Sequence, residues 1–320
     1  MNFTYSLYHN TMITEKEEEI SMRKKIKVFY VDAFTTDTFG GNPAGVIPNA
    51  ENLTDVEMQK IANELNLSET AFLLPSTNTN ADYRIRYFTP TEEVDFCGHA
   101  TLGTAWLMAT KNNWINKDEK IIFESNIGLI PVKWIMENNQ LTKVSMTQVR
   151  PQIKSIDINP KIVADLVGIH DTDIDNRYPI KIGNTGVSHL LVPVKTRQAI
   201  DWAEPKLKEL KKMNNDFNIS TTHLFTFDTN GEFDIYTRDF CPNIGIDEDP
   251  VTGAANGALG GYLYLENILT NGEIHQLVIG QGHAINRPGI LYVTITPDGE
   301  NPIIEVAGPA VISIEGEILV

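Results

Sequence analysis

The chain has 320 residues, of which 42% are apolar and 21% charged, and its formal net charge is −16. A typical domain has about 150 residues, so this length predicts two domains. The acidic balance argues against nucleic acid or an anionic membrane surface as a partner, and no apolar stretch approaches the roughly 18 residues of a membrane span.

The first 24 residues differ from the rest, with an acidic run at Glu15–Glu19 that is followed by basic residues from Arg23. They contain no apolar run of the kind that a secretory signal needs, so residues 1–24 are predicted to be a poorly ordered extension. The chain has two cysteines, Cys97 and Cys241, and no CxxC, HxH or HxxxH spacing. We therefore expect a cytoplasmic protein, no disulfide framework and no metal site.

The first clear element is a strand over residues 26–34, where both alternating sets are largely apolar. Thr54 and Glu57 form a capping-box pattern that predicts a helix to about Asn66. Asn159-Pro160 predicts the start of a second helix, since proline is favoured in a first turn. A lysine-rich surface helix is expected over residues 203–215. Further strands are expected at 83–89, 121–125, 129–136, 141–147, 233–238, 274–280, 290–296 and 303–306.

Two helix-like segments are apolar on every side. Residues 99–110 carry no charge apart from any on His99, and residues 252–265 carry none. A helix that is apolar all round must be buried all round, and a layer of strands wrapped round it is the simplest way to bury it. We predict an α+β fold of two similar domains, each a curved, mostly antiparallel sheet around a central helix. The expected domains are 25–150 and 151–310, with 311–320 as a C-terminal strand that packs on the first domain.

Four short motifs of the first half recur in order about 150 residues later, which indicates an internal duplication. The matched pairs are Gly41-Asn42 with Gly183-Asn184, Phe72 with Phe225, Arg86–Pro90 with Arg238–Pro242, and Cys97-Gly98 with Thr252-Gly253. In this alignment Thr222 is equivalent to Glu69, so only the first copy has an acidic residue at this position. Two similar domains that face each other place the site in the cleft between them.

The two central helices both begin at small-residue turns, at Gly98 and Gly253. Free N–H groups at a helix start bind anions, so a substrate carboxylate is a candidate ligand, although these glycines could instead serve close packing. Glu69 precedes an apolar run, and if it is buried its pKa would be raised toward neutrality. Asp249 lies just before the second turn and could be an N-cap rather than a site residue.

The motifs Gly41–Gly45, Ser68–Phe72, Asp95–Thr101 and Asp249–Gly253 together resemble those of the phenazine-biosynthesis PhzF-like family, from about Lys27 to the C-terminus. The resemblance implies a diaminopimelate-epimerase-like fold, a homodimer, no metal and no organic cofactor. The founding member isomerises dihydro-hydroxyanthranilate by moving a proton along a conjugated system.

By this resemblance Glu69 is the acid/base, His99 hydrogen-bonds the substrate and Asp249 anchors one of its polar substituents. The backbone at Gly98 and Gly253 would hold the carboxylate, and the neighbouring Ala100, Ala254 and Asn42 are further substrate-binding candidates. The sequence departs from the family pattern at Ala254, where the phenazine enzyme has serine. Loss of that hydroxyl removes a substrate hydrogen bond, so the substrate need not be the founding one.

Two other functions remain open at this point. A cofactor-independent amino-acid racemase would use two cysteines, one at each turn, but Thr252 stands where the second would be. The fold could also serve a catalytically silent metabolite-binding or interaction protein, against which the joint presence of Glu69, His99 and Asp249 argues. The expected partner is a small carboxylate, with neither nucleic acid nor membrane.

Overall fold

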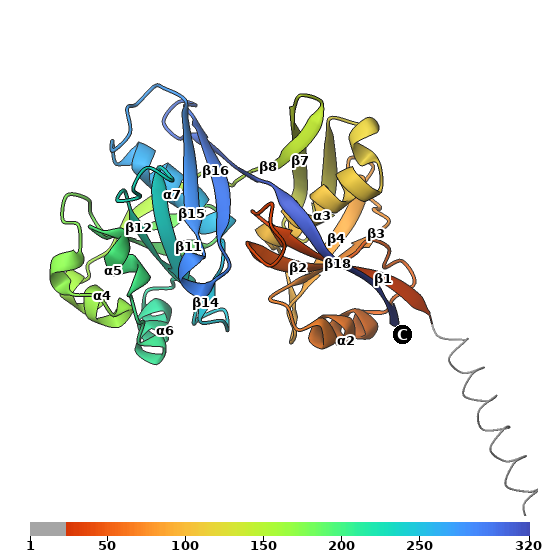
Figure 1. Cartoon of the computed structure of the whole chain (residues 1–320), viewed down its shortest axis with the longest axis horizontal. Helices are drawn as coiled ribbons and strands as arrows, with labels where there is room; N and C mark the ends of the chain where they lie inside the picture. The colour runs from red at the N-terminus through yellow and green to blue at the C-terminus, as the bar shows by residue number, and fades with distance from the viewer. Residues whose placement is uncertain (1–23) are drawn as a thin grey trace, which may run out of the picture.

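The computed structural model describes residues 24–320, so the extension predicted for residues 1–24 lies outside the described residues apart from Lys24. The chain forms two lobes that lie side by side (Figure 1). The first contains β1 (Lys25–Ala33), β2 (Asn42–Ile47), α2 (Asp55–Leu65), β3 (Thr70–Leu74), β4 (Tyr83–Phe88), β5 (Glu93–Val94), α3 (Gly98–Lys111), η1 (Trp114–Asn116), β6 (Lys120–Ser125), β7 (Gly128–Glu137) and β8 (Gln140–Thr147).

The second lobe follows directly along the chain. It contains β9 (Gln152–Ser155), α4 (Pro160–Val167), η2 (Asp171–Asp173), β10 (Lys181–Asn184), β11 (Ser188–Pro193), α5 (Arg197–Asp201), α6 (Leu207–Asp216), β12 (Thr221–Thr226), β13 (Ile235–Phe240), β14 (Glu248–Asp249), α7 (Gly253–Leu265), β15 (His275–Gln281), η3 (His283–Ile285), β16 (Gly289–Thr296) and β17 (Ile303–Gly308). The last strand, β18 (Ala310–Leu319), returns to the first lobe. The fold is α+β with a mixed, mostly antiparallel sheet.

The order of strand pairing in the first lobe is repeated in the second. The β2–β3 and β4–β6 pairs are parallel, as are β11–β12 and β13–β15 at the same places in the second half. The β3–β4, β6–β7 and β7–β8 pairs are antiparallel, and β12–β13, β15–β16 and β16–β17 match them.

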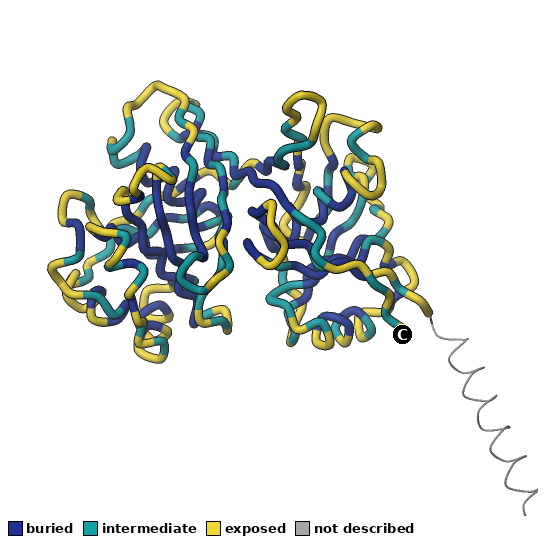
Figure 2. The backbone as a smooth tube through the Cα atoms, in the orientation of Figure 1, coloured by how far each residue is buried: buried dark blue, intermediate teal, exposed yellow. Residues whose placement is uncertain are grey.

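The chain crosses from one lobe to the other before β9 and again before β18. β18 pairs with β1 along its whole length, while β9, which follows the first lobe, pairs with β10 of the second. β8 and β17 also pair with each other across the junction. The chain that crosses between the lobes is largely buried (Figure 2), and Val306 and Ala307 of β17 are among its buried residues. Because hydrogen-bonded strands cross in both directions, the sheet holds the two lobes in one relative position.

The two apolar helices occupy the positions predicted from their composition. α3 packs against β1, β2, β8 and β18, and α7 packs against β9, β10, β16 and β17. Most of their residues are buried, as the lack of charge predicted. The charged helices lie on the outer faces of the lobes, where α2 covers β3 and β4, and α4 packs with α6.

Local signals placed most helix ends correctly. Thr54 and Glu57 form the predicted capping box, and the Asn159 side chain caps α4. The lysine-rich helix, predicted from Ala203, begins only at Leu207. Pro205 accounts for the difference, because a residue that precedes proline is disfavoured in the helical region. In the described part of the chain, no helix is long and apolar enough to cross a membrane.

The predicted repeat alignment was wrong at Gly41-Asn42, because Asn42 begins β2 whereas its predicted match Gly183-Asn184 ends β10, and the counterpart of β2 is β11. It was also wrong by one residue at Glu69. Thr70 pairs with Phe88 and Thr222 pairs with Phe240, so Thr70 and Thr222 are equivalent in register. The residue opposite Glu69 is therefore Thr221 and not Thr222. The error arose from matching Phe72 with Phe225, and a slip of one residue moves a strand side chain to the other face of the sheet.

Glycines in α7 allow the chain to pack closely against the helix. A Cβ on Gly261 would lie 2.3 Å from the Cβ of Pro151, where no side chain fits. Gly261→Ala should therefore lower the free energy of unfolding by about 1–3 kcal/mol, although the same change in an open helix raises it. Gly103→Ala in α3, whose Cβ would meet Val31 at 3.3 Å, is the control and should have a smaller effect. Urea unfolding tests this, and a more stable Gly261→Ala protein would contradict it.

Candidate active site

A cavity of about 80 Å³ lies between the N-terminal ends of the two central helices. Its walls come from both halves of the chain and contain no lysine or arginine. They are formed by Phe34, Phe96, Gly98, His99, Leu102, Met146, Gln148, Asp249, Val251, Thr252, Gly253, Ala254 and Val306. Of the predicted site residues, this cavity brings together His99, Asp249, both helix-start glycines and Ala254.

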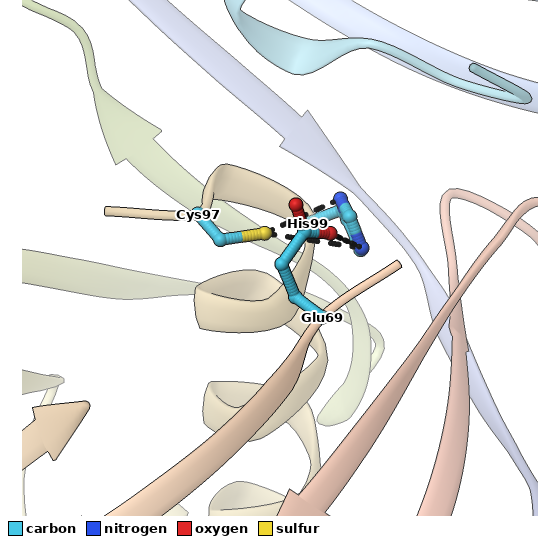
Figure 3. A group of neighbouring side chains, drawn as sticks. All are labelled: Glu69, Cys97 and His99. Carbon is cyan, nitrogen blue, oxygen red and sulfur yellow. Dashed lines mark hydrogen bonds and ion pairs between the residues drawn. The ribbon is translucent and has the colours of Figure 1, made fainter. Parts of the chain in front are cut away.

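Glu69 stands beside this cavity and belongs to a compact cluster with Cys97 and His99. Figure 3 shows the three side chains converging at the start of α3. The His99 Nε2 atom lies 3.4 Å from Glu69 Oε2, and the Cys97 Sγ atom lies 3.5 Å from His99 Nδ1. Glu69 Oε2 is buried and has no partner with good hydrogen-bond geometry, and its polar neighbours are the His99 ring and the Cys97 thiol. Its lone pairs are therefore not committed to a strong hydrogen bond.

Burial shifts the two other members of the cluster toward their neutral forms. The pKa of His99 is lowered by desolvation, against the opposing effect of the Glu69 charge. The pKa of the Cys97 thiol is raised well above its usual value by desolvation and then by Glu69. A protonated thiol is a poor base, and Thr252 occupies the equivalent N-cap position of α7. The two-thiol racemase chemistry is therefore not supported by this geometry.

Asp249 joins the two halves of the chain. One of its carboxyl oxygens accepts a hydrogen bond of 2.7 Å from Asn42 Nδ2, and the other accepts one of 2.6 Å from the Thr252 hydroxyl. Desolvation raises the pKa of Asp249 to about 8, so the group is largely protonated at neutral pH. The alternative that Asp249 is an N-cap was wrong, because Thr252 is the N-cap residue and no side chain caps α7 there.

Of three further predicted substrate-binding residues, one lines the cavity and the other two do not. Asn42 is 1% exposed and donates to both Asp249 and the carbonyl of Val251, so it supports Asp249 from the interior. Ala100 is fully buried, and its backbone hydrogen-bonds to Cys97. Ala254 does line the cavity, while its carbonyl accepts from Thr185.

The sequence analysis missed a buried polar network centred on Gln281. Its carboxamide accepts from the Thr252 N–H and from Asn256, and donates to the Asp249 carbonyl and the Thr252 hydroxyl. Asn256 Oδ1 lies 3.3 Å from a ring nitrogen of His223, whose other ring nitrogen lies 3.2 Å from Asp239. No local pattern marks Gln281, since its partners lie about 25–32 residues away.

Phe34 was also missed, although it shapes the cavity. Its φ of 65° is unusual for an aromatic residue, and its ring lies against Gly253 and Gly308. A Cβ on Gly308 would lie 2.5 Å from Cδ1 of Phe34. The glycines beside the second helix start therefore admit this ring, and such backbone strain is frequent at functional sites.

Comparison with known proteins identifies the family. The model of the phenazine biosynthesis-like protein family matches residues 31–316. The chain belongs to this family. An uncharacterized isomerase of Clostridium acetobutylicum is 36% identical over 304 residues, which cover 93% of this chain and 99% of that protein. This chain is therefore an enzyme of the isomerase class.

Solved structures show the same fold. A PhzF-family protein of Bacillus anthracis is 32% identical with a TM-score of 0.85, over 93% of this chain and 100% of that one. A predicted epimerase of Pseudomonas aeruginosa is 25% identical with a TM-score of 0.76, over 92% of this chain and 99% of that one. The predicted diaminopimelate-epimerase-like class of fold is confirmed by these matches.

The raised pKa of Asp249 predicts a pH dependence of stability. Between its unfolded pKa of about 3.9 and its folded pKa of about 8, the folded state holds a proton that the unfolded state has lost. Stability from this group therefore falls as the pH rises from about 4 to 8. The side chain of Asn does not ionise, so Asp249→Asn should not show this pH-dependent fall in stability. At pH 8 the free energy of unfolding of the variant should exceed that of the wild type by more than about 1 kcal/mol.

Denaturant unfolding at pH 5 and pH 8 checks this, with Asp247→Asn at a nearby exposed position as the control. The stability gain of Asp249→Asn should grow between the two pH values, while that of the control should not. An equal gain at both would contradict the assignment of a raised pKa.

The network around Gln281 should be important for stability. Gln281→Leu leaves the Thr252 N–H and the Asp249 carbonyl without these partners in a buried site, and each lost partner costs about 1–3 kcal/mol. We expect a loss of about 2–4 kcal/mol in urea unfolding. Gln276→Leu, at an exposed position on the same strand, should change stability little. Equal effects of the two substitutions would show that the network is not important.

Proposed function

We propose that this isomerase moves a proton between two carbon positions of a small conjugated carboxylate, without an organic cofactor, and that Glu69 carries the proton. The observation behind the proposal is the free oxygen of Glu69. Its Oε2 atom is buried beside the cleft and has no hydrogen-bond partner, whereas both carboxyl oxygens of Asp249 are engaged. A general base needs an open lone pair within reach of the substrate.

The N-terminal ends of α3 and α7 offer a binding place for the carboxylate of the substrate. Gly98 and Gly253 both line the cavity, and neither N-cap residue makes a side-chain cap hydrogen bond. Backbone N–H groups in such first turns favour an anion, and the helix dipoles add to this attraction. Since the walls contain no arginine or lysine, these helix starts are the source of positive potential in the cavity wall.

The remaining polar groups suit a neutral or weakly polar substituent. The largely protonated Asp249 donates a hydrogen bond to a substrate oxygen or nitrogen, and neutral His99 orients the substrate beside Glu69. Gln148 and Thr252 are the other polar side chains in the wall, and apolar side chains such as Phe34, Phe96 and Leu102 cover the rest. In this site the Glu69 carboxylate removes a proton from one carbon, the conjugated system takes up the electron pair, and protonated Glu69 returns the proton at another carbon.

The test is deuterium uptake at carbon, followed by proton NMR in deuterated water. Dihydro-hydroxyanthranilate and a panel of other small conjugated monocarboxylates serve as substrates. We expect deuterium in the product with the wild-type enzyme and a loss of activity of about 10²–10⁴-fold in Glu69→Gln, the range that acid/base groups contribute. Glu64→Gln, an exposed substitution on α2, should keep full activity.

Two results would count against the proposal. Substantial turnover by Glu69→Gln would remove Glu69 from the role of proton carrier. Absence of deuterium incorporation from every carboxylate in the panel would argue against the substrate class.

A further inference from the structure

We propose that Glu69, Cys97 and His99 form a reversible binding site for a thiophilic divalent cation such as Zn²⁺, and that the bound cation blocks the cleft. The three residues offer one oxygen, one sulfur and one nitrogen ligand, and the donor atoms all lie within 4.8 Å of one another. Only the blocking effect rests on the function proposed above, since binding of the cation does not depend on it.

The donor spacing fits a tetrahedral zinc site. Zinc bonds of about 2.0–2.3 Å to nitrogen, oxygen and sulfur place neighbouring donors about 3.3–3.6 Å apart. His99 Nε2 lies 3.4 Å from Glu69 Oε2 and 3.9 Å from Cys97 Sγ. The two distances from His99 Nε2 are therefore within a few tenths of an ångström of zinc geometry, and the third pair, Glu69 with Cys97, lies within 4.8 Å.

The environment of the cluster also suits a cation. Glu69 Oε2 is a buried carboxylate oxygen with no hydrogen-bond partner, so a cation would satisfy it. The backbone of Pro43 is also a polar neighbour of the His99 ring, and such neighbours orient metal-bound histidines. A mixed sulfur, nitrogen and oxygen set favours Zn²⁺ or Co²⁺ over Mg²⁺ or Ca²⁺, which prefer oxygen ligands alone.

The consequence for the enzyme follows from the identity of the ligands. Coordination releases the Cys97 thiol proton to solvent and occupies the lone pair that Glu69 would use as a base. Three protein ligands leave the fourth tetrahedral position open, and a water or a substrate oxygen could fill it. Zn²⁺ should therefore inhibit turnover reversibly, with activity restored by a chelator.

The experiment uses the full chain after dialysis against EDTA, titrated with Co²⁺ as a spectroscopic probe. We expect one equivalent of tetrahedral Co²⁺ with a thiolate-to-cobalt charge-transfer band that Zn²⁺ displaces. Cys97→Ser should abolish the band and weaken Zn²⁺ binding at least about 100-fold, since loss of even an outer-shell partner costs about 10–100-fold. Cys241→Ser is the matched control, because Cys241 is also buried but lies outside the cluster.

Glu69→Gln and His99→Gln should each weaken Co²⁺ binding while retaining the far-ultraviolet circular dichroism of the wild type. Absence of the charge-transfer band, or its persistence in Cys97→Ser, would overturn the site. Binding without inhibition of turnover would overturn the blocking role alone. Because the cobalt titration contains no substrate, failure of the metal site is distinguishable from failure of the proposed isomerase chemistry.

Discussion

The buried carboxyl of Asp249 is the constraint on which the centre of this molecule depends. A polar group that is removed from water must find hydrogen-bond partners, and those of Asp249 come from both halves of the chain. Asn42, which is 207 residues earlier, supplies one of them, and Thr252 supplies another. Gln281 then ties the backbone of Asp249 to that of Thr252. These contacts align the two lobes at the cleft. The acid stays largely protonated for a different reason, because desolvation raises its pKa against the lowering effect of the Thr252 and Asn42 hydrogen bonds.

The two apolar helices explain why the site lies where it does. Strands surround both helices, so most of each helix is buried. The N-terminal ends of both helices lie in the wall of the cavity between the lobes. The chain crosses between the lobes before β9 and before β18, and these strands complete the layers that pack on α7 and α3, respectively. Uncapped N–H groups at these ends are the electrostatic feature that a carboxylate would use.

Proximity of Glu69 to Cys97 and His99 has two chemical consequences. The free Glu69 oxygen suits proton transfer, and the same oxygen completes a ligand set with the sulfur and the imidazole. The proton-transfer role and the cation site that we propose therefore depend on the same oxygen, and occupation by a cation would exclude proton transfer. Burial of the neighbouring thiol, whose pKa is raised, limits its reactivity toward other reagents.

Local sequence alone determined much of the fold. Uncharged helices, a capping box at Thr54 and the Asn159-Pro160 start were predictable, because each depends on residues within a few positions of one another. The family motifs marked Glu69, His99 and Asp249 as site residues. Only the tertiary structure decided that Glu69 contacts His99 and Cys97, that Asn42 supports Asp249, and that Thr221 is the counterpart of Glu69. Those relations arise from strand register and from the packing of distant segments, and periodicity along the chain holds no information about either.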